Sequence, residues 1–158
     1  MNQLVYFSDM TDTRTFEHAL TVDAPRDRVF RAITVADELK RWWITDGISE
    51  PRPGGRFRYE WTMADPSNDH VQEGTYDEVV DGERVAFPWA GPGGDSHVTL
   101  ALSESNGGTQ VSLVHEGISA EDQFERYEQG WQGFLANLKS VLEGGPDNRA
   151  AMGVQTLA

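Results

Sequence analysis

The chain has no cysteine, no long run of apolar residues and a shortage of basic side chains. Without cysteine it can form no disulfide, no thiolate metal site and no cysteine nucleophile. No segment approaches the roughly 18 consecutive apolar residues that a membrane-spanning helix requires. The opening residues, MNQLVYFSDMTDTRTFEHAL, lack a basic region followed by an apolar run. We therefore predict a cytoplasmic protein with no membrane span.

Basic residues are outnumbered by acidic ones. The 13 Lys and Arg residues stand against 26 Asp and Glu residues, which gives a formal net charge of -13. Nucleic-acid binding depends on Lys and Arg that displace counterions from phosphates, so we expect no nucleic-acid partner. The excess of carboxylates is typical of a soluble surface.

Motifs for metals, phosphates and nucleophilic serine are also missing. The histidines His18, His70, His97 and His115 do not have the spacing of metal ligands, and the Gly-rich segments lack the strand-loop-helix context of phosphate sites. The sequence therefore predicts no metal and no cofactor.

What the sequence does contain is a long alternation of apolar and polar residues. This alternation predicts strands over residues 15–22, 56–61, 70–80, 84–90, 97–104 and 109–117. The connections between the later strands are short, so these strands must be antiparallel neighbours. Helical spacing predicts two short helices over residues 23–34 and 37–43 and a long one from about Ala120 to Leu142.

The order of these elements indicates an α+β fold. A chain of 158 residues is long enough for one domain with a single hydrophobic core. We expect a flexible N-terminal arm over residues 1–13, the domain over residues 14–143 and a flexible C-terminal tail over residues 144–158. A twisted antiparallel sheet curls, and only the last helix is long enough to cover its buried face. A curved sheet and a straight helix do not fit closely everywhere, which favours a pocket between them.

The order and spacing of several segments resemble a known superfamily. These segments are DAPRDRVFRAIT, DELKRWW, PGGRFRYEW, EGTYDEVV, RVAFPW, TQVSLVHEG and GWQGFLANLKSVLE. Together they resemble the START/Bet v 1-like superfamily, whose helix-grip fold wraps a curved antiparallel sheet around a long C-terminal helix. Within it, the chain is similar to the domain of the activator of Hsp90 ATPase homologue 1. The resemblance covers about residues 14–143.

The resemblance implies a function as well as a fold. Related proteins bind a small hydrophobic molecule, lipid-like or polyketide-like, in the cavity between sheet and helix, and a minority catalyse a reaction there. The family name also suggests an Hsp90-like partner or a role in stress response. We expect a monomer or weak homodimer that binds a ligand and is not an enzyme.

A set of mainly aromatic residues is the candidate ligand site. Two interpretations remain open, since large rings serve equally well as core. The tyrosine hydroxyls and indole N–H groups need partners, which a wet or ligand-filled cavity would supply. The set is Trp43, Phe57, Tyr59, Trp61, Tyr76, Phe87, Trp89, Leu100, Leu113, His115, Phe124, Tyr127, Trp131 and Phe134.

Two members of this region raise separate questions. Adjacent helical positions lie about 100° apart, so Trp43 is expected at the cavity mouth and Trp42 on the outer side, partly exposed. Alternatively, both tryptophans anchor the helix on the sheet. His115 shares a face with Val111 and Leu113 and can act as the acid or base of a cyclase-type or hydrolase-type enzyme, or be a hydrogen-bonded core histidine.

Overall fold

The structure is a computed structural model that describes residues 13–91, 94–119 and 121–156. Apart from Thr13, the predicted N-terminal arm lies outside the described residues. Within those residues, no helix combines the length and apolar character needed to cross a membrane.

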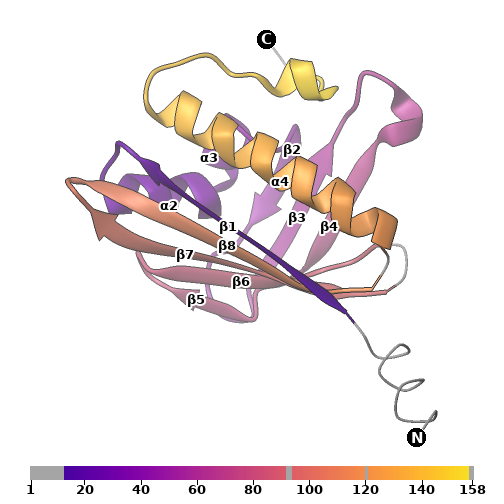
Figure 1. Ribbon diagram of the computed structural model, residues 1–158, viewed down its shortest axis with the longest axis horizontal. Helices are drawn as coiled ribbons and strands as arrows, with labels where there is room; N and C mark the ends of the chain where they lie inside the picture. The colour runs from indigo at the N-terminus through magenta and orange to yellow at the C-terminus, as the bar shows by residue number, and fades with distance from the viewer. Residues whose placement is uncertain (1–12, 92–93, 120, 157–158) are drawn as a thin grey trace, which may run out of the picture.

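In the described part of the chain, eight strands form two antiparallel sheets that together make one curved wall (Figure 1). The five-stranded sheet has the order β1-β8-β7-β6-β5 and the three-stranded sheet the order β2-β3-β4. The strands are β1 (Arg14–Val22), β2 (Asp46–Ser49), β3 (Arg56–Trp61), β4 (His70–Thr75), β5 (Glu78–Val80), β6 (Arg84–Trp89), β7 (Ser96–Ser105) and β8 (Gly108–Ile118).

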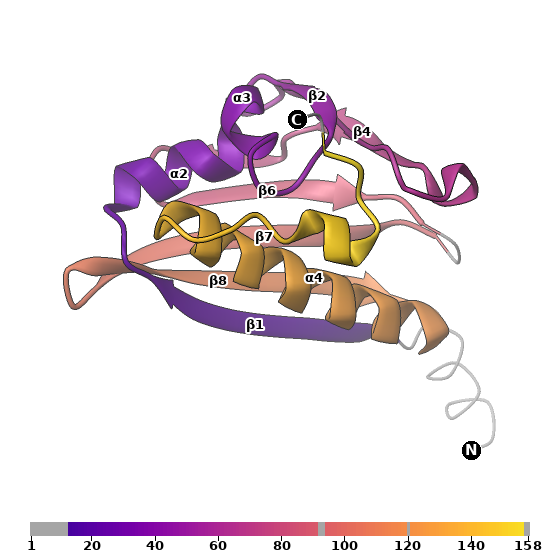
Figure 2. The same cartoon turned by 90° about the horizontal axis from the view of Figure 1, so that it is seen from above.

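Among the residues that the structure describes, one long helix lies across this wall, and two short helices close one end of it (Figure 2). Helix α4 has 22 residues, so it is about 33 Å long and spans the sheet. The helices are α2 (Arg26–Thr34), α3 (Ala36–Leu39) and α4 (Glu121–Leu142), with single turns η1 (Pro66–Asn68) and η2 (Arg149–Met152). This arrangement confirms the predicted α+β helix-grip fold.

Residues 70–80, predicted as one strand, form two strands that belong to different sheets. β4 pairs with β3 as far as Thr75, and β5 pairs with β6 from Glu78. Between them the Tyr76 N–H donates to the Gly55 carbonyl, while the Asp77 N–H donates to the Ala86 carbonyl, each at 2.9 Å. The chain changes partner at this point, and the two sheets become a single curved surface.

A buried glutamine joins the two sheets a second time. Gln72 is 2% exposed, and its Oε1 accepts from the Ala90 N–H at 2.9 Å while its Nε2 donates to the Ala90 carbonyl. The side-chain amide therefore bonds to β6 as the backbone of a neighbouring strand would. It fixes the end of β4 beside the end of β6.

The C-terminal segment is not the flexible tail that the sequence predicts. Its described residues, 144–156, fold back beside α4 (Figure 2). Arg149 is 5% exposed, donates to the Ile44 carbonyl at 2.7 Å and pairs with Asp147, which also accepts from Asn137. The Gly-Gly-Pro sequence at residues 144–146 does end the helix, but the residues after it have partners on α4 and in the segment that follows α3.

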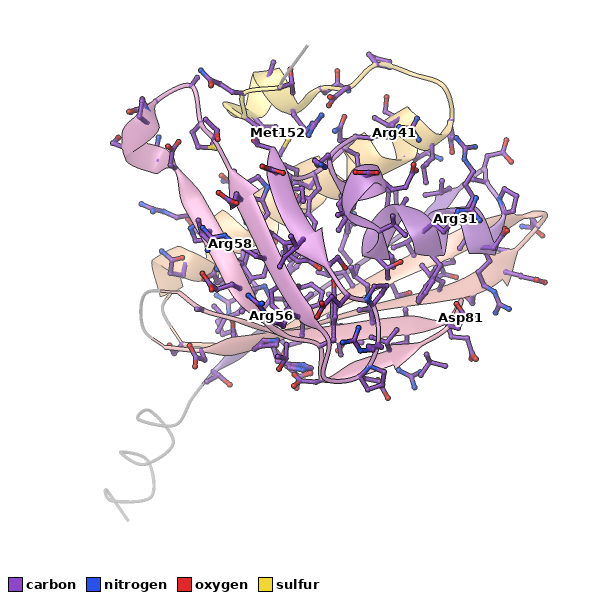
Figure 3. All side chains as sticks on the ribbon, turned by 180° about the vertical axis from the view of Figure 1, so that it is seen from behind. Arg31, Arg41, Arg56, Arg58, Asp81 and Met152 are labelled. Carbon is purple, nitrogen blue, oxygen red and sulfur yellow. The ribbon has the colours of Figure 1, made fainter. Side chains whose placement is uncertain are left out.

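The same segment continues into backbone pairing with the residues that follow β3. The Ala64 N–H donates to the Gly153 carbonyl at 2.7 Å, and the Gln155 N–H donates to the Thr62 carbonyl at 2.8 Å. Met152, labelled in Figure 3, reaches α4 at Gly133, where an added Cβ would lie 2.6 Å from the Met152 Cε. A side chain at Gly133 would therefore require the end of the flexible Met152 side chain to move.

The ion pair that holds the segment provides a test of this packing. Removing one partner of a fully buried pair costs about 3–5 kcal/mol, and because Asp147 is 32% exposed we expect about 2 kcal/mol for Asp147→Ala. The loss is measured as the free energy of unfolding in urea. Asp37→Ala, which removes a 90% exposed partner of Lys40, is the control and should change little. Equal effects of the two substitutions would contradict the packing described here.

Candidate functional site

Trp42 and Trp43 both point into the protein, so the prediction of a partly exposed Trp42 is wrong. They are 1% and 2% exposed, and their rings stack with centroids 5.4 Å apart. The expectation assumed that both residues lie in a helix, but α3 ends at Leu39 and the following residues form turns. Trp42 Nε1 donates to the Ala32 carbonyl at 2.8 Å, so this tryptophan anchors α2.

Trp43 is the centre of a group of rings contributed by both sheets and by α4. Its ring centroid lies 5.0 Å from that of Tyr59, 5.3 Å from that of Trp61 and 5.5 Å from that of Trp131. Such tilted and edge-to-face contacts are the arrangements that aromatic quadrupoles favour. The rings converge as the sequence predicts, but much of this convergence is close packing.

A cavity of about 190 Å³ lies at the seam between α4 and the sheet, on the side of β3, β4 and β6. On α4, the lining positions recur at intervals of one and three to four residues, which is one helical face. Gly130 belongs to this face, and an added Cβ there would meet no atom within 4 Å. The lining consists of Trp43, Trp61, Met63, Asn68, His70, Trp89, Arg126, Tyr127, Gly130, Trp131 and Phe134.

The structure therefore separates the predicted site residues into two groups. Those that line the cavity are Trp43, Trp61, Trp89, Tyr127, Trp131 and Phe134. Those that lie away from it, in the packed core, are Phe57, Tyr59, Tyr76, Phe87, Leu100, Leu113, His115 and Phe124. Sequence reasoning missed Met63, Asn68, His70, Arg126 and Gly130, although the α4 members share the helical face of Tyr127 and Trp131.

The buried tyrosine hydroxyls have partners within the protein and need no ligand. Ser49 Oγ donates to the Thr34 carbonyl, so it accepts from the Tyr76 hydroxyl at 2.6 Å, and Tyr76 in turn accepts from the Tyr59 hydroxyl at 2.5 Å. Burial raises the pKa of Tyr59 and, to a smaller extent, that of Tyr76. Both groups stay neutral at physiological pH, and the chain of hydroxyls fastens β2 to the core.

His115 is fully buried and both of its ring nitrogens have partners. The Trp131 indole N–H donates to Nδ1 at 3.0 Å, so the ring proton is on Nε2, which lies 2.7 Å from Ser96 Oγ. Burial, assisted by the charge of His97, lowers the pKa of His115 to about 4. His115 is therefore a neutral core histidine that positions Trp131, and its proton does not face the cavity.

Trp61 carries a polar group that has not found a partner. Its buried Nε1–H makes no hydrogen bond to any residue that the structure describes. An unsatisfied buried donor costs about 1–3 kcal/mol, and native proteins contain few of them. Trp61 lines the cavity with its ring, but the N–H itself is covered by protein atoms and does not open onto the cavity.

The described residues contain no group of three or more His, Asp or Glu side chains that could hold a metal ion. The cavity itself offers ring faces, the polar side chains of Asn68, His70 and Tyr127, and one guanidinium.

Known structures with this architecture come from several bacteria. Protein CV1439 from Chromobacterium violaceum is 28% identical, with a TM-score of 0.73, over 84% of this chain and 99% of that one. CalU16 from Micromonospora echinospora is 26% identical, with a TM-score of 0.66, over 84% of this chain and 77% of that one. The Aha1 dimer from Colwellia psychrerythraea matches at 20% identity and a TM-score of 0.73, over 84% and 98% of the two chains, which shows the fold alone.

At the level of sequence, no curated protein matches this chain significantly. A family model does match, however, over residues 23–143, which include α2, the wall of strands from β2 to β8 and all of α4. The resemblance found in the sequence to the START/Bet v 1-like superfamily is confirmed by this match and by the shared architecture. The chain belongs to the family of activator of Hsp90 ATPase homolog 1-like proteins.

Proposed function

We propose that the protein binds a small aromatic molecule of one or two rings in the cavity between α4 and the sheet. The observation that carries this proposal is the cavity itself, about 190 Å³ in volume and walled by Trp43, Trp61, Trp89 and Trp131. Ring faces provide large contact areas at little cost in conformational entropy. The mouth is bordered by Asn68 and His70, which offer polar contacts to the bound molecule.

The volume favours a small ligand over the lipid-like or polyketide-like molecule that the resemblance implies. An apolar protein cavity of about 150 Å³ is known to accept benzene, whereas sites for drug-sized ligands measure about 300–1,000 Å³. A cavity of about 190 Å³ therefore suits one or two fused rings. A long acyl chain would extend into solvent.

The neutral bicyclic compound naphthalene-2-carboxamide is a suitable first probe. We expect it to bind with a dissociation constant of about 10–500 µM, because a ligand of this size buries little area against the cost of association. Isothermal titration calorimetry measures the constant directly. Absence of binding at millimolar concentrations would contradict the proposal.

Gly130 allows the location of the site to be tested in the same experiment. Gly130→Leu fills open space at the cavity wall and removes a helix-interior glycine, so the protein should stay folded while binding is lost. Ala136→Leu adds a leucine at an exposed position of the same helix and should leave binding unchanged. Undiminished binding by Gly130→Leu would place the ligand elsewhere.

Catalysis by His115 has less support, because this side chain is fully buried with both nitrogens bonded. An Hsp90-like partner stays a prediction that the family description alone supports.

A further inference from the structure

The charge around the cavity is opposite in sign to the charge of the protein. The chain has a formal net charge of -13, yet none of the described residues that line the cavity is a carboxylate. Arg126 is the one lining residue with a permanent charge. A ligand at the cavity would therefore meet a positive group on a molecule whose remaining surface repels anions.

Arg126 is also free to bind a ligand. Several other arginines of the chain are already paired with a carboxylate. Arg84 lies 2.6 Å from Glu78, and Arg58 lies 2.6 Å from Glu73. Arg126 is exposed and has no ion-pair or hydrogen-bond partner among the residues that the structure describes. A guanidinium binds a planar carboxylate through two parallel hydrogen bonds. No carboxylate among the lining residues competes with a ligand for Arg126.

His70 adds an uncharged donor to the polar groups of the cavity, beside Asn68 and Tyr127, which can both donate and accept. Gln72 Nε2 donates to His70 Nε2 at 2.9 Å, so the neutral His70 ring has its proton on Nδ1. Partial burial lowers the pKa of His70, which keeps the ring in this form. A ligand that brings acceptor atoms fits this set of donors.

We infer that the cavity binds an aromatic anion, a one-ring or two-ring molecule with a carboxylate that Arg126 holds at the mouth while Trp43, Trp61, Trp89 and Trp131 enclose the rings. This inference rests on the proposed function and adds the charge of the ligand to it. The negative charge of the protein repels anions that have no rings to fill the cavity. A selective ligand therefore needs both the aromatic rings and the carboxylate.

Two probes of equal shape and different charge test the inference. Naphthalene-2-carboxylate should bind about five to ten times more tightly than naphthalene-2-carboxamide at pH 7 and low salt, as a partly exposed pair with a good two-bond geometry allows. Both constants are measured by isothermal titration calorimetry. Raising the salt from about 50 to 500 mM should weaken binding of the carboxylate and leave that of the carboxamide almost unchanged.

Arg126→Gln should bring the carboxylate down to the affinity of the carboxamide and leave the carboxamide constant unchanged. Arg56→Gln is the matched control, because Arg56 is an exposed arginine on β3, on the face of the sheet turned away from α4 (Figure 3). It makes the same change in net charge and should preserve the preference for the carboxylate.

The outcomes separate the two proposals. Equal binding of the two probes, or a preference that persists in Arg126→Gln, overturns the inference and leaves the aromatic site standing. Failure of both probes to bind overturns the aromatic site, and the anion preference with it.

Discussion

The Trp43→Ala protein is expected to be about 3–5 kcal/mol less stable than the parent, because this is the usual cost of truncating a buried tryptophan. Trp43 is 2% exposed and contacts rings from both sheets and from α4. It also borders the cavity, so its removal enlarges an existing space that the neighbouring rings already fail to fill. Unfolding in urea, followed by far-ultraviolet circular dichroism, measures the change.

Trp43→Phe is the matched substitution, since it keeps a ring at this position and removes less volume. It should cost about 1–2 kcal/mol, in keeping with a partial loss of packing. If Trp43→Ala proved as stable as Trp43→Phe, the ring contacts of Trp43 would contribute little and the core would have to be described differently.

The second large effect is a loss of stability in mild acid caused by His115. Burial lowers the pKa of this group from 6.5 to about 4 in the folded protein, while the unfolded chain keeps the ordinary value. Between these two values the unfolded state binds a proton that the folded state does not, so stability falls as the pH falls from 6.5 to 4. At 1.36 kcal/mol per unit, the loss is about 3 kcal/mol.

Carboxylates also titrate in part of this range, so the contribution of His115 has to be isolated by comparison. His115→Gln retains an acceptor for the Trp131 N–H and a donor for Ser96, but it cannot be protonated. The variant should be less stable at pH 7, and its free energy of unfolding should decline less steeply between pH 6.5 and 4. Identical slopes in parent and variant would show that His115 is not held neutral by burial.

Much of the fold was predictable because local patterns dictate it. Strand alternation in RFRYEW and the apolar stripe of α4 each follow from one period of hydrophobicity. Two features were not predictable from such patterns. The segment at residues 70–80 forms two strands because its two halves pair with different strands, β3 and β6. The segment after α4 is held by contacts with residues such as Ile44, about a hundred positions earlier.

The position of the cavity could be predicted, and so could six of its eleven lining residues, but the sequence did not show which other rings belong to the core. The misfit between a curved sheet and a straight helix indicates where space remains, and Tyr127 and Trp131 identify the face of α4 that borders it. Which rings are core depends on hydrogen bonds that no local pattern contains. The Tyr76 hydroxyl donates to Ser49, on a strand that the sequence did not predict, and accepts from the Tyr59 hydroxyl, so both tyrosines belong to the core.

The pairing of the C-terminal segment with the residues after β3 has a consequence for the behaviour of the protein in a crowded solution. Thr62 and Ala64 follow β3, beyond the last residue of β3 that pairs with β2. Without the C-terminal segment, their backbone groups would extend an unpaired strand edge. Unpaired strand edges can pair with strands of other molecules, which is how aggregation begins. Because Gly153 and Gln155 bond to these groups, fewer backbone donors and acceptors are left open to a strand of another molecule.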